Sequence, residues 1–367
     1  MAQIAVVAGE TSGDIHAGNL VSAILSRAPG TSIWGIGGER IAAAGGRLLL
    51  DYSSISAMGF VEALSNISAL KSARRMMVEE FKANPPDLFI PVDFGGFNLP
   101  LAEIAAKMGI PVIYFIPPKA WAWRRSRVKR VRRTAERLMT ILPFEESFWR
   151  ENGVPCDYVG SPILDHLDPV THAEEPDLVG LLPGSRRSEV TRLWPLMVEA
   201  ARIMSKTKKL RFVAPRAEGL DPELLSAPPD IDIEILPGSS QEVMERARVL
   251  IIASGTATLE CSLIGKPMVV VYRFSPLSLF LVKRLVKIDY MALPNLIAGE
   301  KIVPELLQAK PEEAASLALK LLEDGPTRST MVKDLQAVRE SMGERGASAR
   351  AASIVCGFLE ERGLLDA

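Results

Sequence analysis

Short apolar runs alternate with longer stretches of helical periodicity along the first half of the chain. Each run has the length of a buried strand, and the runs are QIAVVA, SIWGIGG, PDLFIPVD, PVIYFI and RLMTILP. Apolar strands separated by helices indicate βαβ units, in which helices cover both faces of a parallel sheet. The first half of the chain is therefore predicted to be an α/β domain.

The same pattern restarts after a polar segment, DHLDPVTHAEEPD, which is rich in Pro, Asp and Glu and is typical of a linker. The later strand candidates are DLVGLLPG, LRFVAPR, IDIEILPG, RVLIIASG and PMVVVYR. We predict two Rossmann-like parallel-sheet domains, 1–168 and 175–342, which face a central cleft where a ligand lies at the carboxyl ends of the strands. A helix at about 343–367 is expected to pack back on the first domain.

Composition and charge exclude several classes of function. The 367 residues are 48% hydrophobic, and the formal net charge of −1 gives the whole chain no attraction for nucleic acid. Cys156, Cys261 and Cys356 are too widely spaced for a disulfide framework or a zinc site, so we expect a reducing compartment and neither a metal nor a cofactor. The N-terminus has no export pattern and the chain has no apolar run of about 18 residues, so we expect neither a leader nor a membrane span.

The second half contains two turns suited to phosphate. In IIASGTATLE, a strand leads into Ser254, Gly255 and Thr256 at a helix start, where free N–H groups and the helix dipole favour a pyrophosphate. Glu260 follows about one turn later, where its carboxylate can accept hydrogen bonds from a ribose diol. An ordinary Ser/Thr cap followed by a solvated glutamate explains this pattern equally well.

The second turn is in LLPGSRRSEV, where Arg186 and Arg187 follow a strand. An arginine at this place can clamp phosphate with paired N–H donors. The alternative is a surface arginine paired with Glu189. Two such turns in one domain favour the phosphate interpretation over either turn taken alone.

Acidic and polar side chains follow strands in the first half. GETSGDIHAGNL places Glu10, Ser12, Asp14 and His16 directly after the first strand, and PVDFGGFN places Asp93 after a later one. A strand-end carboxylate can be a general base for a hydroxyl group, but a lone aspartate more often caps the next helix. His16 taken alone is more often structural than catalytic.

Two segments combine basic and apolar residues. KAWAWRRSRVKRVRR has seven Arg or Lys in positions 124–133, preceded by Trp121 and Trp123, and FSPLSLFLVKRLVKIDYMALPNL, 274–296, is amphipathic. A solvated helix face and ordinary core packing account for most such patterns. Tryptophan beside arginine also suits an anionic membrane surface or a phosphate-bearing lipid. No nucleic-acid-binding motif is present, and the hydrolase-elbow, zincin and P-loop signatures are absent as well.

Seven motifs in a fixed order resemble lipid-A-disaccharide synthase, glycosyltransferase family 19. They are GETSGD, MGFVEAL, WAWR, LPFEESF, LPGSRRSEV, ASGTATLE and YRFSPLSLFLVKRLVKIDYMALPNLIAG, and the match runs from about residue 5 to residue 308. The resemblance implies an inverting, metal-independent enzyme of GT-B fold that transfers 2,3-diacylglucosamine from UDP to the 6-hydroxyl of 2,3-diacylglucosamine 1-phosphate, or lipid X. It also implies a cytoplasmic protein at the inner membrane surface, and it leaves a homodimer open.

The resemblance assigns roles to residues. Asp93 is implied as the base and Glu10 as the second candidate. The first domain would hold the acceptor and the second the UDP-sugar. The implied donor contacts are Arg186, Ser254, Gly255, Thr256, Glu260 and Asn295, and the implied acceptor or membrane contacts are Ser12, His16, Trp121, Trp123 and Arg124.

Some positions depart from the family pattern. Gly95 and Gly96 stand where many members have a proline and a second acid, Lys119 lies in PPKAWAW, and Ser161 replaces a common histidine. We expect variation within the same activity. The rivals are another UDP-sugar enzyme of this fold, such as the transferase of the peptidoglycan lipid precursor or an epimerase, and a binding protein without turnover.

Overall fold

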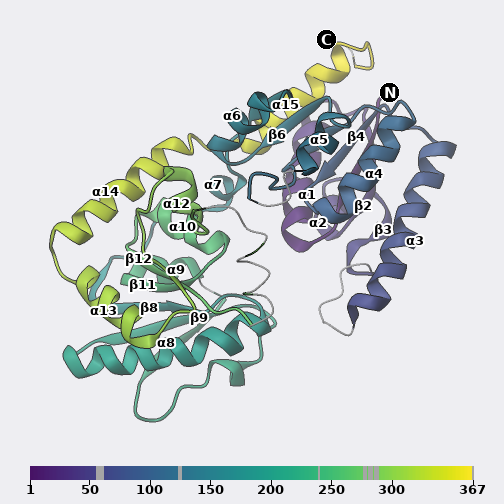
Figure 1. Ribbon diagram of the computed structural model, residues 1–367. Helices are drawn as coiled ribbons and strands as arrows, with labels where there is room; N and C mark the ends of the chain where they lie inside the picture. Colours follow the sequence, from purple (N-terminus) through teal and green to yellow (C-terminus); the bar gives the residue numbers. More distant parts are fainter. Residues whose placement is uncertain are drawn as a thin grey trace. The chain divides into compact units, whose positions relative to one another are not determined.

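The computed structural model consists of two compact α/β units, each built on a parallel sheet (Figure 1). It describes residues 1–54, 62–122, 126–238, 240–275, 279, 284 and 289–365. The first unit comprises Met1–Asp165 and Glu344–Ala367, and the second comprises His166–Gly343. The predicted fold class of two Rossmann-like parallel-sheet domains is confirmed.

The first unit holds a sheet with the strand order β3-β2-β1-β4-β5-β6-β7 in the described residues. Its strands are β1 (Gln3–Ala8), β2 (Ser32–Gly37), β3 (Arg47–Asp51), β4 (Leu88–Val92), β5 (Ile113–Phe115), β6 (Arg137–Thr140) and β7 (Cys156–Tyr158). Its helices are α1 (Thr11–Arg27), α2 (Glu39–Ala43), α3 (Glu62–Ala83), α4 (Gly95–Lys107), α5 (Ser126–Arg132), α6 (Pro143–Glu151), α7 (Pro162–His166) and α15 (Ala347–Glu360).

Burial explains why the strands of the first unit read as unbroken apolar runs. All five residues of β4 and all but the first residue of β1 are buried, because helices cover both faces of the sheet. The strand order reverses direction between β1 and β4, which are neighbours although 79 residues separate Ala8 and Leu88 along the chain. Ligands of open α/β sheets bind beyond the carboxyl ends of the strands at such a point.

The chain's last helix completes the first unit. α15 packs on α1, and its residues Ala351, Val355 and Leu359 share a core cluster with β1. Arg350 Nε donates to the Val159 carbonyl over 2.7 Å, which fixes the start of α15 near the end of β7.

The second unit repeats the topology, with the strand order β10-β9-β8-β11-β12-β13 in its described part. Its strands are β8 (Glu175–Leu182), β9 (Arg211–Arg216), β10 (Ile233–Pro237), β11 (Ala247–Ala253), β12 (Met268–Tyr272) and β13 (Glu305–Leu307). Its helices are α8 (Arg187–Thr207), α9 (Ser240–Arg246), α10 (Thr256–Ile264), α12 (Leu293–Ala298), α13 (Pro311–Leu322) and α14 (Pro326–Ser341). Here the order reverses between β8 and β11.

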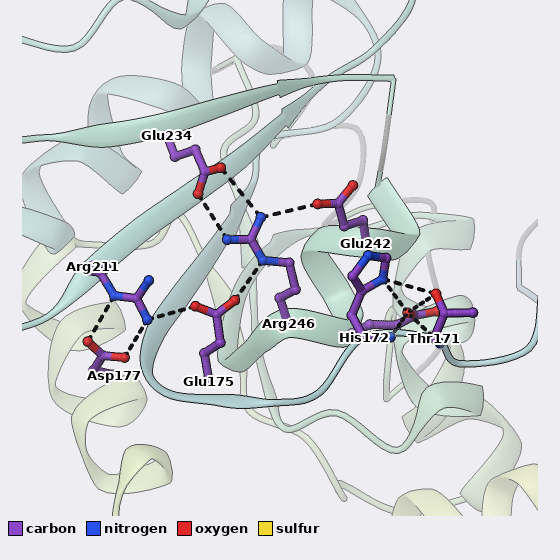
Figure 2. A network of polar contacts seen from close by, with 9 residues as sticks. Thr171, His172, Glu175, Asp177, Arg211, Glu234, Glu242 and Arg246 are labelled. Atoms are coloured by element: carbon purple, nitrogen blue, oxygen red, sulfur yellow. Dashed lines mark hydrogen bonds and ion pairs between the residues drawn. The ribbon is translucent and has the colours of Figure 1, made fainter.

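Polar contacts fasten the linker to the second unit (Figure 2). The buried Glu245 on α9 accepts hydrogen bonds from the backbone N–H groups of Thr171 and His172, both over 3.0 Å. Burial raises the pKa of its carboxyl, but the hydrogen bond from Gln241 and those from Thr171 and His172 outweigh it and lower the pKa to about 2. Nearby, Arg246 reaches Glu175 over 2.7 Å and Glu234 over 3.1 Å. Helix α9 therefore binds both the end of the linker, through Glu245, and the start of β8, through Arg246.

The described residues include no helix that is both long enough and apolar enough to span a bilayer. The same residues contain no cluster of three or more His, Cys, Asp or Glu side chains that could hold a metal ion.

Candidate active-site residues

The carboxyl ends of β1 and β4 bring two predicted carboxylates together. Ala8 and Val92 are paired in the parallel register, so the segments that leave these strands start side by side. Glu10 follows β1 as the N-cap residue of α1, and Asp93 follows β4 directly. The charge of Glu10 contributes to the raised pKa of the Asp93 carboxyl, as expected for carboxyls that follow adjacent strands.

The backbone at Asp93 is strained and held in place. Asp93 and Phe94 both lie in the left-handed region, with φ of 44° and 46°, which is costly for two successive residues that carry a Cβ. The carbonyl of Asp93 accepts hydrogen bonds from Asn98 Nδ2 over 2.9 Å and from the Tyr114 hydroxyl over 3.1 Å. Strain maintained by surrounding bonds at a strand end is typical of a functional position.

Burial is the largest cause that raises the pKa of the Asp93 carboxyl, and the neighbouring Glu10 raises it further. The Lys119 ammonium and the N–H of Phe94 oppose this shift. The N-cap residue of α4 is Phe94, without a side-chain cap, so capping of α4 does not occupy Asp93. A partly buried carboxyl with a raised pKa suits proton transfer.

The residues of GETSGDIHAGNL fall into two groups, those accessible at the end of β1 and one with a structural role. Ser12 is exposed in the first turn of α1, and His16 lies half-buried one turn later. Asp14 instead has a structural role: it is buried and accepts hydrogen bonds from the N–H groups of Gly38 over 2.7 Å and Arg40 over 3.0 Å, so it caps α2.

The double glycine offers open space at one position. A Cβ on Gly96 would meet nothing within 4 Å, whereas one on Gly95 would lie 3.0 Å from Pro118. Of the two glycines, Gly96 borders open space, and Gly95 allows close packing of Pro118 against α4.

Sequence reasoning missed the buried acid of α6. Glu145, in the first turn of α6, is 3% exposed and accepts a hydrogen bond from Trp121 Nε1 over 2.9 Å. Burial raises the pKa of the Glu145 carboxyl to about 7. The sequence signal was weak, because Glu146 stands next to Glu145 and only tertiary packing shows which of the two is buried. Trp123 and Arg124 lie outside the described residues.

In the second unit, α10 begins at the carboxyl end of β11 with Gly255 as its N-cap residue and no side-chain cap. Gly255 and Thr256 are exposed, so the first N–H groups of α10 are available to an anion. The predicted alternative, a serine or threonine cap, is absent there. Ser254 instead hydrogen-bonds the phenol oxygen of Tyr272, at the end of the neighbouring strand β12.

Arg186 precedes α8 at the carboxyl end of β8 and is exposed. Its Nη1 donates to Glu189 Oε1 over 2.9 Å. The surface pair that the sequence offered as an alternative is thus present. Since β8 and β11 are adjacent, Arg186 and the start of α10 lie at the same edge of the sheet.

Glu260 and Asn295 differ in their surroundings. Glu260 is half-buried on α10, burial raises the pKa of its carboxyl, and it has no hydrogen-bond or ion-pair partner in the part of the chain that the structure describes. Asn295 is fully buried: its Nδ2 donates to the Val303 carbonyl and to Glu305, and its Oδ1 accepts from the N–H groups of Ile302 and Val303. Asn295 therefore fixes the segment that enters β13.

The two parallel-sheet units define a class by their fold, the GT-B fold. The glycosyltransferase of kitacinnamycin matches with a TM-score of 0.66 and 17% identity over 99% of both chains. MurG from Acinetobacter baumannii matches with a TM-score of 0.60 and 15% identity over 97% of this chain and 100% of that one. At these identities the likeness establishes the fold.

The family follows from closer similarity. A family model described as lipid-A-disaccharide synthetase matches residues 4–355. Proteins named lipid-A-disaccharide synthase are 38% identical in Trichlorobacter lovleyi, over 98% of both chains, and 39% identical in Myxococcus xanthus, over 97% of both chains. The chain belongs to the lipid-A-disaccharide synthase family and is a glycosyltransferase.

Proposed function

We propose that the protein transfers 2,3-diacylglucosamine from UDP to the 6-hydroxyl of 2,3-diacylglucosamine 1-phosphate. The products are the β-1,6-linked disaccharide 1-phosphate and UDP. Membership of the family supports this reaction. The observation that carries the assignment of roles is the contrast between the strained, partly buried Asp93 beside Glu10 in one unit and the uncapped start of α10 in the other.

On the acceptor side, Asp93 takes the proton of the 6-hydroxyl as its oxygen attacks the anomeric carbon. The raised pKa of Asp93 favours this transfer, because a more basic carboxylate accepts the proton more readily. Glu10 is the second candidate for the base and otherwise maintains that pKa. Ser12 and His16, in the first turns of α1, would contact the acceptor from the same strand end.

On the donor side, the N–H groups at the start of α10 and the guanidinium of Arg186 stabilise the negative charge that grows on UDP as the glycosidic bond breaks. Arg186 would exchange Glu189 for phosphate when the donor binds. The carboxylate of Glu260, which has no partner among the described residues, would accept hydrogen bonds from the ribose hydroxyls. Asn295 would act through Glu305, which accepts a hydrogen bond from the hydroxyl of Tyr272.

Both substrates carry acyl chains, so we propose that the protein works at the cytoplasmic face of the inner membrane. The basic helix α5 supports this in part. It buries Val128 and Val131, and Arg130 forms a forked pair with Glu103 over 2.6 and 2.8 Å. The exposed Lys129, Arg132 and Arg133 would meet anionic headgroups. Binding to anionic vesicles should then weaken as salt is added, because screening shortens the reach of these charges, whereas salt-independent binding would contradict this attachment.

The test of the reaction is product formation. Purified protein is incubated with UDP-2,3-diacylglucosamine and lipid X in the presence of EDTA, and the products are analysed by mass spectrometry. We expect the disaccharide 1-phosphate and UDP. UDP binding without any disaccharide would contradict the proposed activity and favour a binding protein of the same fold.

A further inference from the structure

One carboxylate of the second unit accepts hydrogen bonds from three segments of the chain. Glu305, the first residue of β13, accepts the Tyr272 hydroxyl of β12 over 2.9 Å and Asn295 Nδ2 of α12 over 2.7 Å. Its Oε2 also accepts the backbone N–H of Met291, ahead of α12, over 3.0 Å. The half-buried Glu305 therefore ties the end of β12 to the segment that enters α12.

The hydrogen bond between Tyr272 and Glu305 has a fixed direction. An ionised carboxylate can only accept, so the phenol donates its proton to Glu305. Burial is the largest cause that raises the pKa of the Tyr272 phenol, and it keeps that proton on the phenol. The oxygen of Tyr272 is left as an acceptor for any other hydroxyl beside it.

The hydroxyl beside Tyr272 belongs to Ser254, at the start of the candidate donor site. β11 and β12 pair with Ala253 opposite Val271, so Ser254 leaves β11 next to Tyr272, and the two side chains are hydrogen-bonded. Since the phenol proton is given to Glu305, Ser254 donates and Tyr272 accepts. We call this series of bonds the Ser254–Tyr272–Glu305 chain.

The turn after β11 is also held on its helix side. The Gly255 carbonyl accepts the Thr258 hydroxyl over 2.7 Å and the Thr258 N–H over 3.2 Å. The turn is thus anchored within α10 and across the sheet, while the first N–H groups of α10 have no side-chain cap. Donors that are fixed before an anion binds give tighter binding, because no free energy is lost in ordering them.

We propose that Glu305 is a positioning residue for the donor site: through the Ser254–Tyr272–Glu305 chain it holds the turn that presents the N–H groups of α10 to the pyrophosphate. The proposal rests on the proposed function of that helix start. It also defines the part that Ser254 plays. Because its hydroxyl proton is given to Tyr272, Ser254 acts by fixing the turn, and the backbone N–H groups make the phosphate contacts.

The first test needs no ligand. The protein has five tyrosines, so carbon-13 labelling at the tyrosine Cζ gives few NMR signals, and Tyr272→Phe identifies the signal of Tyr272. We expect this signal to shift in Glu305→Gln and in Ser254→Ala, because each variant changes a hydrogen bond of the phenol oxygen. Glu300→Gln is the matched control, since Glu300 is exposed just after α12. A Tyr272 signal that Glu305→Gln or Ser254→Ala leaves in place would overturn the proposal.

The second test measures UDP binding by calorimetry. Glu305→Gln and Tyr272→Phe should each weaken it by roughly 3- to 10-fold, the range for one hydrogen bond, and Glu300→Gln should bind as the wild type does. The double variant Glu305→Gln/Tyr272→Phe should bind no more weakly than the weaker single variant, because both changes break the same chain.

A purely structural role of Glu305 gives a different result in the same experiment. Glu305 would then act through Asn295 and Met291, so its loss would add to that of Tyr272→Phe, and additive losses would overturn the proposal. UDP binding by the wild type that Glu305→Gln leaves unchanged would overturn this proposal alone. A wild type that binds no UDP would instead contradict the proposed function.

Discussion

The two units have the same strand order around their reversal points, yet the residues that follow the central strands carry opposite charge. In the first unit, β1 and β4 lead into carboxyl groups, and burial raises the pKa of Asp93. In the second unit, β8 and β11 lead into an exposed arginine and an uncapped helix N-terminus. Under the proposed function, one topology supplies a proton acceptor in one domain and an anion site in the other, and the difference lies in the few residues that follow each strand.

The comparison predicts that removing the proton acceptor stops the reaction. Asp93→Asn keeps the size of the side chain and its polar contacts but cannot accept the proton, so turnover should fall by about 10²- to 10⁴-fold. The rate of disaccharide formation under saturating donor and acceptor checks this. Glu10→Gln is the matched control and should lose less. Full turnover in Asp93→Asn would contradict the assignment of Asp93 as the base.

Stability should respond to pH through Glu145. Its folded pKa of about 7 lies above the ordinary value of 4.5, so the unfolded chain ionises first as pH rises. The free energy of unfolding is therefore undiminished below about pH 4.5 and falls as pH rises towards 7, by about 3 kcal/mol in total. Glu145→Gln lacks this loss. Denaturant unfolding at pH 5 and pH 8 should show the variant gaining on the wild type at the higher pH, and parallel stabilities would contradict the burial of a carboxyl there.

Removal of the anion clamp should weaken donor binding. Arg186→Ala deletes a charge-assisted donor to phosphate, worth about 1.5–3 kcal/mol, so the KM for the UDP-sugar should rise by roughly 10- to 100-fold. Initial rates at varied donor concentration give this value. The exposed Arg192 on α8 provides the control variant, Arg192→Ala, with little expected effect. An unchanged donor KM in Arg186→Ala would exclude the role.

The smallest expected difference separates the two glycines of α4. A Cβ on Gly95 would lie 3.0 and 3.1 Å from Pro118, whereas one on Gly96 would meet nothing within 4 Å. Gly95→Ala should therefore be less stable than Gly96→Ala by about 1 kcal/mol, because Pro118 has to shift. Thermal unfolding of the two variants measures this difference. Equal melting temperatures would show that Pro118 can shift without cost.

The apolar runs predicted the fold because buried parallel strands need unbroken hydrophobic sequence, as in β4 and β11. The same topology places Glu10 and Asp93 after two adjacent strands, at one edge of the sheet. Burial of individual polar side chains could not be predicted in this way. Nothing local distinguishes the buried Glu145 from its neighbour Glu146, or reveals that Asp14 caps α2 and that Asn295 is fully engaged within its own unit. The partners of Glu145 and Asp14 lie 24 residues away in the chain, and those of Asn295 lie in the loop and strand that follow its helix.

The division of roles between the two sheet edges is tested most directly by calorimetric titration of UDP into the wild type, Asp93→Asn and Arg186→Ala. We predict that Asp93→Asn binds UDP as the wild type does and that Arg186→Ala binds it more weakly. A loss of UDP affinity in Asp93→Asn as large as that in Arg186→Ala would place Asp93 in the donor site and contradict the account.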